Sequence, residues 1–219
     1  MNIKKIGLRA GHSPNCKGAI ALRDEYNCMY TLYLETKKIL EEYGYEIVDC
    51  NSTGNTEFKE LNEGVRKANN ADVDLFISFH MNKYNTKAHG VEALTHSEKS
   101  RANPIAQRLC DNFSGYLGLT NRGVKYKPTY YEMCNVNAPN IIFETMFCDN
   151  DYDINKVWSP TPYEVMARLI ANAIDLNIPV NKNKKYQVRY YTFSSKEDAE
   201  NFYNKVKTIS GAYGQIEEM

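Results

Sequence analysis

Short apolar runs alternate with longer segments of helical pattern over about residues 3–178, and this alternation constrains the fold more than any other feature. The run from Val73 to Phe79 is almost continuously apolar, as expected of a strand covered on both faces of a sheet. From Tyr26 to Tyr43, apolar residues recur at helical spacing until Gly44 ends the pattern. The sequence therefore predicts an α/β fold, in which a twisted, mostly parallel sheet carries helices on both faces and can include an antiparallel edge.

The other expected elements continue the alternation. In an open sheet of this class, functional loops lie at the carboxyl ends of the strands. We expect strands at residues 3–8, 45–50, 90–95, near Tyr130 and at 140–143, and helices at 57–69, 103–117 and 161–176.

The character of the chain changes after residue 180. Residues 181–185 are polar and without periodicity, so the prediction divides the chain into a main domain at 1–180, a linker at 181–185 and a tail at 186–219. The tail pattern of an alternating run, a capping serine and a glycine-containing turn predicts a small β-α-β unit. Because a unit of this size buries little surface, we expect it to dock on the main domain or to form a homo-oligomer by pairing with its copy.

Composition excludes several classes of partner. The 27 basic and 27 acidic residues cancel to a formal charge of zero, which favours neither nucleic acid nor an acidic membrane surface. No apolar segment has the length of a signal peptide core or of a membrane span. The six cysteines are scattered without C-x-x-C pairs, so we interpret them as free thiols. We expect a protein made in the cytoplasm that does not insert into a membrane.

Four side chains suited to metal binding or proton transfer stand at the ends of the expected elements: His12, Glu25, His80 and Glu144. Two imidazoles and one carboxylate, with a fourth position left for water, make the open coordination of a catalytic zinc. Such a zinc lowers the pKa of its bound water to about 7 and polarises the attacked carbonyl. A second glutamate beside that water can take its proton and pass it to the leaving nitrogen.

Each of these residues also has an ordinary structural explanation. A histidine after a buried strand, such as His80, is most often a hydrogen-bonded structural residue, and a glutamate that opens a helix, such as Glu25, interacts favourably with the helix dipole. Glu144 differs, because a carboxylate after an apolar run is costly unless a cation or a reacting proton compensates it. Cys16 and Cys28 lie close in sequence to the expected ligands, so a thiolate ligand stays an alternative.

Four ordered blocks together resemble the zinc-dependent N-acetylmuramoyl-L-alanine amidases: RAGHS around His12, EYN from Glu25, NNADVDLFISFHMN around His80, and ETMFCDN from Glu144. The resemblance covers about residues 3–178 in the order and spacing of the family. It implies one zinc ion per chain, held by His12, Glu25 and His80, and Glu144 as the catalytic carboxylate. It also implies the substrate, bacterial peptidoglycan, and cleavage of the amide between N-acetylmuramic acid and the L-alanine of the stem peptide.

Further residues are expected to contact the substrate. Asn82 closes the third block, and His89 precedes Gly90, which matches a family glycine. The tail resembles half of a peptidoglycan-binding repeat of sporulation and division proteins, and its Tyr190 and Tyr191 are candidates for stacking on sugar rings. Alternate aromatic residues of that strand would instead form the core of a small sheet.

These observations favour a phage or prophage endolysin, made in the cytoplasm and reaching the wall when it is released through a membrane hole. A lytic amidase freed when a sporulating mother cell breaks open is an alternative. A binding protein that kept the fold without the chemistry would predict a broken quartet of residues, and here all four positions carry competent side chains. A metallo-amidase acting on a small soluble amide is a further alternative.

Overall fold

The computed structural model of the chain describes residues 2–158, 163–180, 195, 197–198 and 200–201. The chain divides into two compact units, Met1–Lys182 and Asn183–Met219. The expected linker and most of the expected β-α-β tail, including Tyr190 and Tyr191, lie outside the described residues. Within the second unit, Ser195 Oγ accepts a hydrogen bond from the Asp198 N–H at 3.1 Å, which is the bond of a helix N-cap.

A single six-stranded sheet forms the centre of the first unit, in the order β2-β1-β3-β6-β4-β5. Strands β2, β1, β3 and β6 run parallel, whereas β4 pairs antiparallel with β6 and carries β5 parallel to itself at the edge. The predicted mostly parallel sheet with an antiparallel edge region is therefore confirmed. The strands are β1 Lys5–Ala10, β2 Glu46–Asp49, β3 Leu75–Asn82, β4 Val91–Thr95, β5 Asn121–Tyr126 and β6 Asn140–Phe147.

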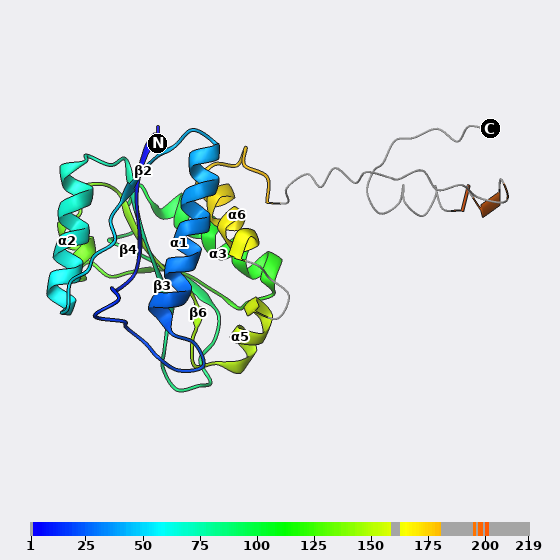
Figure 1. The fold of residues 1–219 in the computed structure, drawn as a ribbon, viewed down its shortest axis with the longest axis horizontal. Coiled ribbons are helices and arrows are strands. Elements are labelled where there is room, and N and C mark those ends of the chain that lie inside the picture. The colour runs from blue at the N-terminus through cyan, green and yellow to red at the C-terminus, as the bar shows by residue number, and fades with distance from the viewer. Residues whose placement is uncertain (1, 159–162, 181–194, 196, 199, 202–219) are drawn as a thin grey trace. The chain divides into compact units, whose positions relative to one another are not determined.

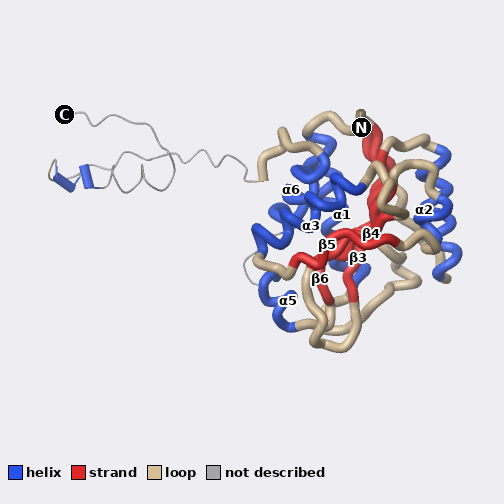
Figure 2. The backbone as a smooth tube through the Cα atoms, turned by 180° about the vertical axis from the view of Figure 1, so that it is seen from behind, coloured by secondary structure: helices blue, strands red, loops and turns tan. Residues whose placement is uncertain are grey.

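Helices cover both faces of this sheet, as the sequence predicts (Figure 1). Helices α1, α3 and α6 pack on one face over the larger core, and α1 lies beside α6. Helix α2 lies on the other face of the sheet (Figure 2), where α2 and α4 pack over a smaller core. Among the described residues, no helix combines the length and the apolar character needed to cross a membrane. The helices are α1 Glu25–Glu42, α2 Glu57–Asn70, α3 Asn103–Leu117, α4 Tyr131–Asn135, α5 Asp151–Trp158 and α6 Tyr163–Ile174.

Local caps set the ends of the helices that matter for the site. Asp24 accepts a hydrogen bond from the Asn27 N–H at 3.0 Å and so places Glu25 at the first position of α1. Helix α3 ends at Gly118, whose φ of 71° lies in the left-handed region that favours glycine. The side chain of Glu25 therefore lies at the N-terminus of the long helix α1, beyond the carboxyl ends of the parallel strands.

The structure corrects the sequence prediction in three places. The strand expected near Tyr130 is wrong, because Tyr130 precedes the short helix α4 and the strand is β5, before Pro128. Strand β5 was not predicted because this edge strand, half-buried along most of its length, has no apolar run. Strands β3 and β6 extend beyond their predicted ends, so His80 and Glu144 lie within strands. Helix α5 was not predicted, since it is short and polar.

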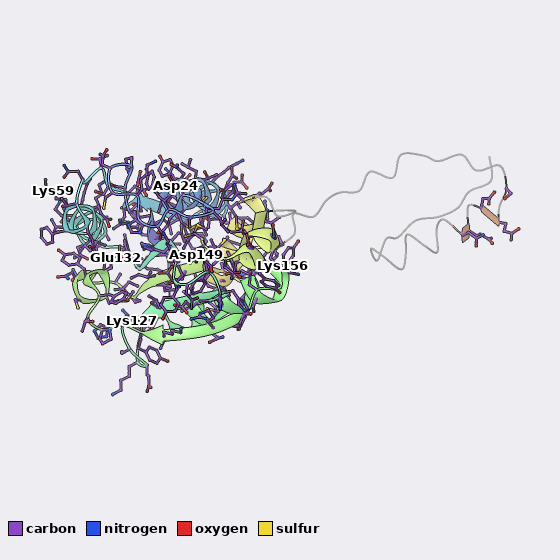
Figure 3. All side chains as sticks on the ribbon, turned by 90° about the horizontal axis from the view of Figure 1, so that it is seen from below. Asp24, Lys59, Lys127, Glu132, Asp149 and Lys156 are labelled. Carbon is purple, nitrogen blue, oxygen red and sulfur yellow. The ribbon has the colours of Figure 1, made fainter. Side chains whose placement is uncertain are left out.

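A buried ion cluster joins β1 to the helices of the smaller face. Arg9 is fully buried and forms ion pairs with Glu60 of α2 and with Glu132 of α4, the latter at 3.0 Å. Both carboxylates are also buried, and Glu132 lies inside the body of the domain (Figure 3). Arg9 Nη2 also approaches the carbonyl oxygen of His12 at 3.3 Å. The cluster thus fixes the loop that carries His12.

Candidate active site

Three side chains that could hold a metal ion come from distant parts of the chain and meet beyond the parallel strands. His12 follows β1, Glu25 opens α1 and His80 lies in β3, and one ligand atom of each lies within 4.8 Å of the others. Glu25 Oε1 is 3.2 Å from His12 Nε2 and 3.0 Å from His80 Nδ1. Tetrahedral zinc bonds of ordinary length place neighbouring ligand atoms about 3.3 Å apart, so these two separations suit a shared ion. Neither Cys16 nor Cys28 belongs to this cluster within the described residues.

Glu25 is an ionised carboxylate held from several sides. Its Oε1 accepts a hydrogen bond from the Met81 N–H at 3.0 Å, and its Oε2 accepts one from the Ala19 N–H at 2.8 Å. Burial raises the pKa of Glu25, but hydrogen bonds and charge interactions with His12 and His80 outweigh burial and hold that pKa well below its ordinary value. The cluster therefore offers a fixed anionic oxygen between two imidazoles.

The second nitrogen of each imidazole faces a polar group behind the cluster. His80 Nε2 lies 2.9 Å from Ser78 Oγ, and His12 Nδ1 lies 3.9 Å from Glu60 Oε1. The two rings meet edge to face, with centroids 4.9 Å apart and an interplanar angle of 78°. Partners behind the ligands orient imidazole rings and increase their basicity in metal sites. This geometry leaves His80 Nδ1 and His12 Nε2 as the nitrogens that face Glu25.

Two glycines make room for the side chains of His12, Glu25 and His80. A Cβ on Gly11 would collide with the ring of His80, and a Cβ on Gly18 would collide with the ring of His12 and approach Glu25. His12, which follows Gly11, has a φ of 71°. This value is uncommon for a residue with a side chain and is often found at functional sites. The loop after β1 is thus shaped around the three ligands.

Replacement of Gly11 by alanine is expected to displace the His80 ring and to lower metal affinity by at least about tenfold, as loss of ligand support does in metal sites. Metal titration of the purified variant measures this. Gly115→Ala in α3 is the matched control, because a Cβ there meets nothing within 4 Å and metal affinity should not change. A Gly11→Ala protein with unchanged metal affinity would contradict this packing.

Glu144 is brought beside the cluster by the register of the sheet. In β6 it pairs with His80 of β3 on one side and with Glu92 of β4 on the other, and paired residues project from the same face. Glu144 Oε2 is shielded from solvent and has no hydrogen-bond partner within the described part of the chain. Burial raises the pKa of Glu144 to about 7, with the negative charge of Glu25 adding to the effect. Its carboxyl group is therefore suited to proton transfer near neutral pH.

A row of charged side chains, the charged row, continues on this face from Glu144 to Glu92, Arg122 and Lys125, and the sequence patterns did not indicate these last three residues. Glu92 Oε2 accepts hydrogen bonds from Arg122 Nε at 2.6 Å and from Lys125 Nζ at 2.7 Å. The Asn82 amide donates to Glu92 Oε1 at 3.1 Å. Glu92 is the one acid in an apolar, fully buried strand, and the cost of burying a carboxylate there is a sequence signal for it, as it is for Glu144.

Residues 6–176 match the family model described as N-acetylmuramoyl-L-alanine amidase. The chain belongs to this amidase family. An uncharacterised protein of Clostridium perfringens is 30% identical over 174 residues, which are 78% of this chain and 51% of that protein. The amidase LytC of Bacillus subtilis is 30% identical over 158 residues, covering 69% of this chain and 31% of LytC. The chain thus spans about half the length of the first relative and less of the second.

Solved structures of the amidase family share this fold. The catalytic domain of the CD27L endolysin targeting Clostridia difficile superposes with a TM-score of 0.73 at 26% identity, covering 81% of this chain and 99% of that domain. The agreement supports the α/β sheet described above and extends over nearly the whole of that domain.

Asn82 and His89, which are also expected to contact the substrate, lie in different parts of the fold. Asn82 is near the charged row through its bond to Glu92. His89 lies in the loop between β3 and β4, where its Nδ1 is 3.1 Å from Thr120 Oγ1 and its ring lies 5.4 Å from that of Tyr152. Substrate contact by Asn82 and His89 stays a prediction, as it does for Tyr190 and Tyr191.

Two surface hollows lie away from the candidate active site. Their volumes are about 270 and 260 Å³, and both are lined by Arg101, Asn137, Ala138 and Pro139 near the start of β6. The first also includes the exposed His96. Neither contains a member of the ligand cluster or Glu144, so these hollows carry none of the candidate chemistry.

Proposed function

We propose that this chain hydrolyses the amide bond between N-acetylmuramic acid and the L-alanine of the stem peptide in bacterial peptidoglycan. Membership of the amidase family supports this reaction class. The observation that carries the proposal is the register pairing of Glu144 with His80. It places a carboxylate whose Oε2 has no hydrogen-bond partner among the described residues beside three side chains that could hold a metal ion. A metal site and a proton-transfer group side by side are what hydrolysis of an amide requires.

The proposed metal is zinc, with His12, Glu25 and His80 as its ligands. Two imidazole nitrogens and one carboxylate oxygen are a common ligand set of catalytic zinc, and two of the separations between ligand atoms suit the tetrahedral geometry. Zinc bound there would supply a water of lowered pKa and polarise the carbonyl of the scissile amide.

The protein side chains do the rest of the proposed work. Glu25, fixed by backbone N–H groups, keeps the negative charge between the two imidazoles. Glu144 takes a proton from the attacking water and delivers it to the nitrogen of L-alanine, which then leaves as a free amine. The burial that raises the pKa of Glu144 favours its carrying that proton.

Digestion of purified cell walls tests the proposed reaction. Release of new L-alanine amino groups without new reducing sugar is expected, because the amide and not the glycosidic bond is cut. New reducing ends, or intact walls beside a hydrolysed small amide, would contradict the proposal. Walls that bind the protein and release nothing would favour a non-catalytic binding protein.

The proposed biological role is that of a phage or prophage endolysin that acts at the wall after release from the cytoplasm. The likeness to the endolysin catalytic domain supports this role more than that of a sporulation amidase. In this proposal the tail at 186–219 keeps the enzyme near its polymeric substrate, which raises the local concentration of cleavable bonds.

A further inference from the structure

A pair of cationic side chains lies on the same face of the sheet as Glu144. The pair belongs to the edge strand, which β4 separates from the strand of Glu144. Arg122 and Lys125 project from the edge strand β5, and both bind the carboxylate of Glu92 in β4. Their side chains are 30% and 39% exposed, whereas that of Glu92 is only 10% exposed. The acid therefore lies beneath the two cations, which face solvent.

Glu92 is the carboxylate that Arg122 and Lys125 share. Burial raises the pKa of Glu92, but hydrogen bonds from Lys125 and Arg122 outweigh burial and keep the group ionised. Asp153 is a further carboxylate whose charge acts on Arg122, so both cations have acidic neighbours. The two cations are still more exposed than Glu92, and an anion arriving from solvent would meet them without displacing Glu92.

Contacts also hold the guanidinium group of Arg122 in position, and one edge of this group is available to a ligand. Its guanidinium lies 5.0 Å from the centroid of the Phe147 ring, and its Nη1 approaches the carbonyl oxygen of His89 at 3.5 Å. Within the described part of the chain, nothing accepts a hydrogen bond from Nη2. A guanidinium fixed in this way is a good partner for a planar carboxylate, because little side-chain entropy is lost on binding.

The position of the pair relative to Glu144 indicates what it would meet. Neighbouring strands lie about 4.8 Å apart, so β5 lies roughly 10 Å from β6 across β4. An extended peptide covers about 3.4 Å per residue. A peptide that extends from the bond cut beside Glu144 would therefore reach Arg122 and Lys125 after two to three residues. Sugar rings of the glycan offer no ionised oxygen at such a point, whereas a stem peptide does.

We propose that Arg122 and Lys125 form a subsite that binds an ionised carboxylate of the stem peptide and so selects acidic over amidated stems. This inference rests on the proposed amidase function. Glu92 acts as the anchor that orients both cations, and Asn82 orients Glu92 in turn. A cluster that only held β5 against β4 would affect stability without any preference between the two kinds of stem.

The test compares two soluble muropeptides with the same sugar and sequence, one with free stem carboxylates and one with those carboxylates converted to primary amides. The wild-type protein is expected to cleave the free form with a kcat/KM about tenfold higher, the ratio expected for one charge-assisted hydrogen bond. In Arg122→Gln and Lys125→Met the ratio should fall toward one, through a higher KM for the free form and an unchanged kcat. Lys37→Met on α1 is the matched charge control and should retain the wild-type ratio.

Equal cleavage of both muropeptides by the wild-type protein, or an equal loss on both in Arg122→Gln, would overturn the subsite. If the wild-type protein cleaves neither, calorimetric binding of the isolated stem peptide in its two forms decides the question. If the wild-type protein binds the free form more tightly and Arg122→Gln loses this preference, the subsite is supported and only the amidase proposal is refuted. If the wild-type protein binds both forms equally, the subsite is refuted as well. Thermal unfolding of each variant shows that it is folded, and Arg122→Lys should recover part of the preference.

Discussion

Replacement of Glu144 by glutamine is expected to slow wall cleavage by about 10²- to 10⁴-fold, the contribution that a positioned general base makes. Glutamine has the same shape but can neither take a proton from water nor pass one to the leaving nitrogen. Because Glu144 Oε2 has no hydrogen-bond partner in the described structure, the substitution breaks no existing bond. The variant should therefore fold and bind metal as the wild-type protein does.

Release of amino groups from walls measures the rate, and metal analysis of the same sample measures the bound ion. Glu46→Gln is a suitable control, since its side chain is 66% exposed and its ion pair with Lys5 is at the surface. Cleavage by Glu144→Gln at the native rate would refute the assigned role. A loss of metal together with activity would instead show that Glu144 supports the ligand cluster.

Replacement of His80 or His12 by alanine is expected to reduce bound zinc from about one ion per chain to nearly none and to abolish wall cleavage. Each substitution removes one of the three proposed ligands and leaves the buried carboxylate of Glu25 with fewer partners. Treatment of the wild-type protein with a chelator should have the same effect, and added zinc should restore activity.

The measurements are zinc content after gel filtration and amino groups released from walls. His96→Ala is the matched control, because His96 is exposed and lines a hollow that contains no member of the ligand cluster. A His80→Ala protein that keeps a full equivalent of zinc would exclude His80 as a ligand. Because Glu144→Gln should keep zinc and His80→Ala should lose it, the two variants together separate proton transfer from metal binding.

Much of the main sheet could be predicted because its signals are local. The apolar run that became β3, the helical spacing of α1 and the capping residues act within a few positions of one another. The cost of burying a carboxylate selected Glu144 by the same kind of local argument. A strand was predicted near Tyr130, where the structure has helix α4, and β5 was not predicted. An edge strand and a five-residue helix bury little and so leave weak patterns.

The sequence by itself determined the fold class, the order of the elements and the residue types able to bind a metal or move a proton. Only the tertiary structure decided which of them meet: the register sets Glu144 between His80 and Glu92, and Gly11 leaves the room for the His80 ring. It also placed Arg122 and Lys125 on the catalytic face. The physical reason is that strand order and register depend on packing between segments far apart in the chain, which no pattern within one segment encodes.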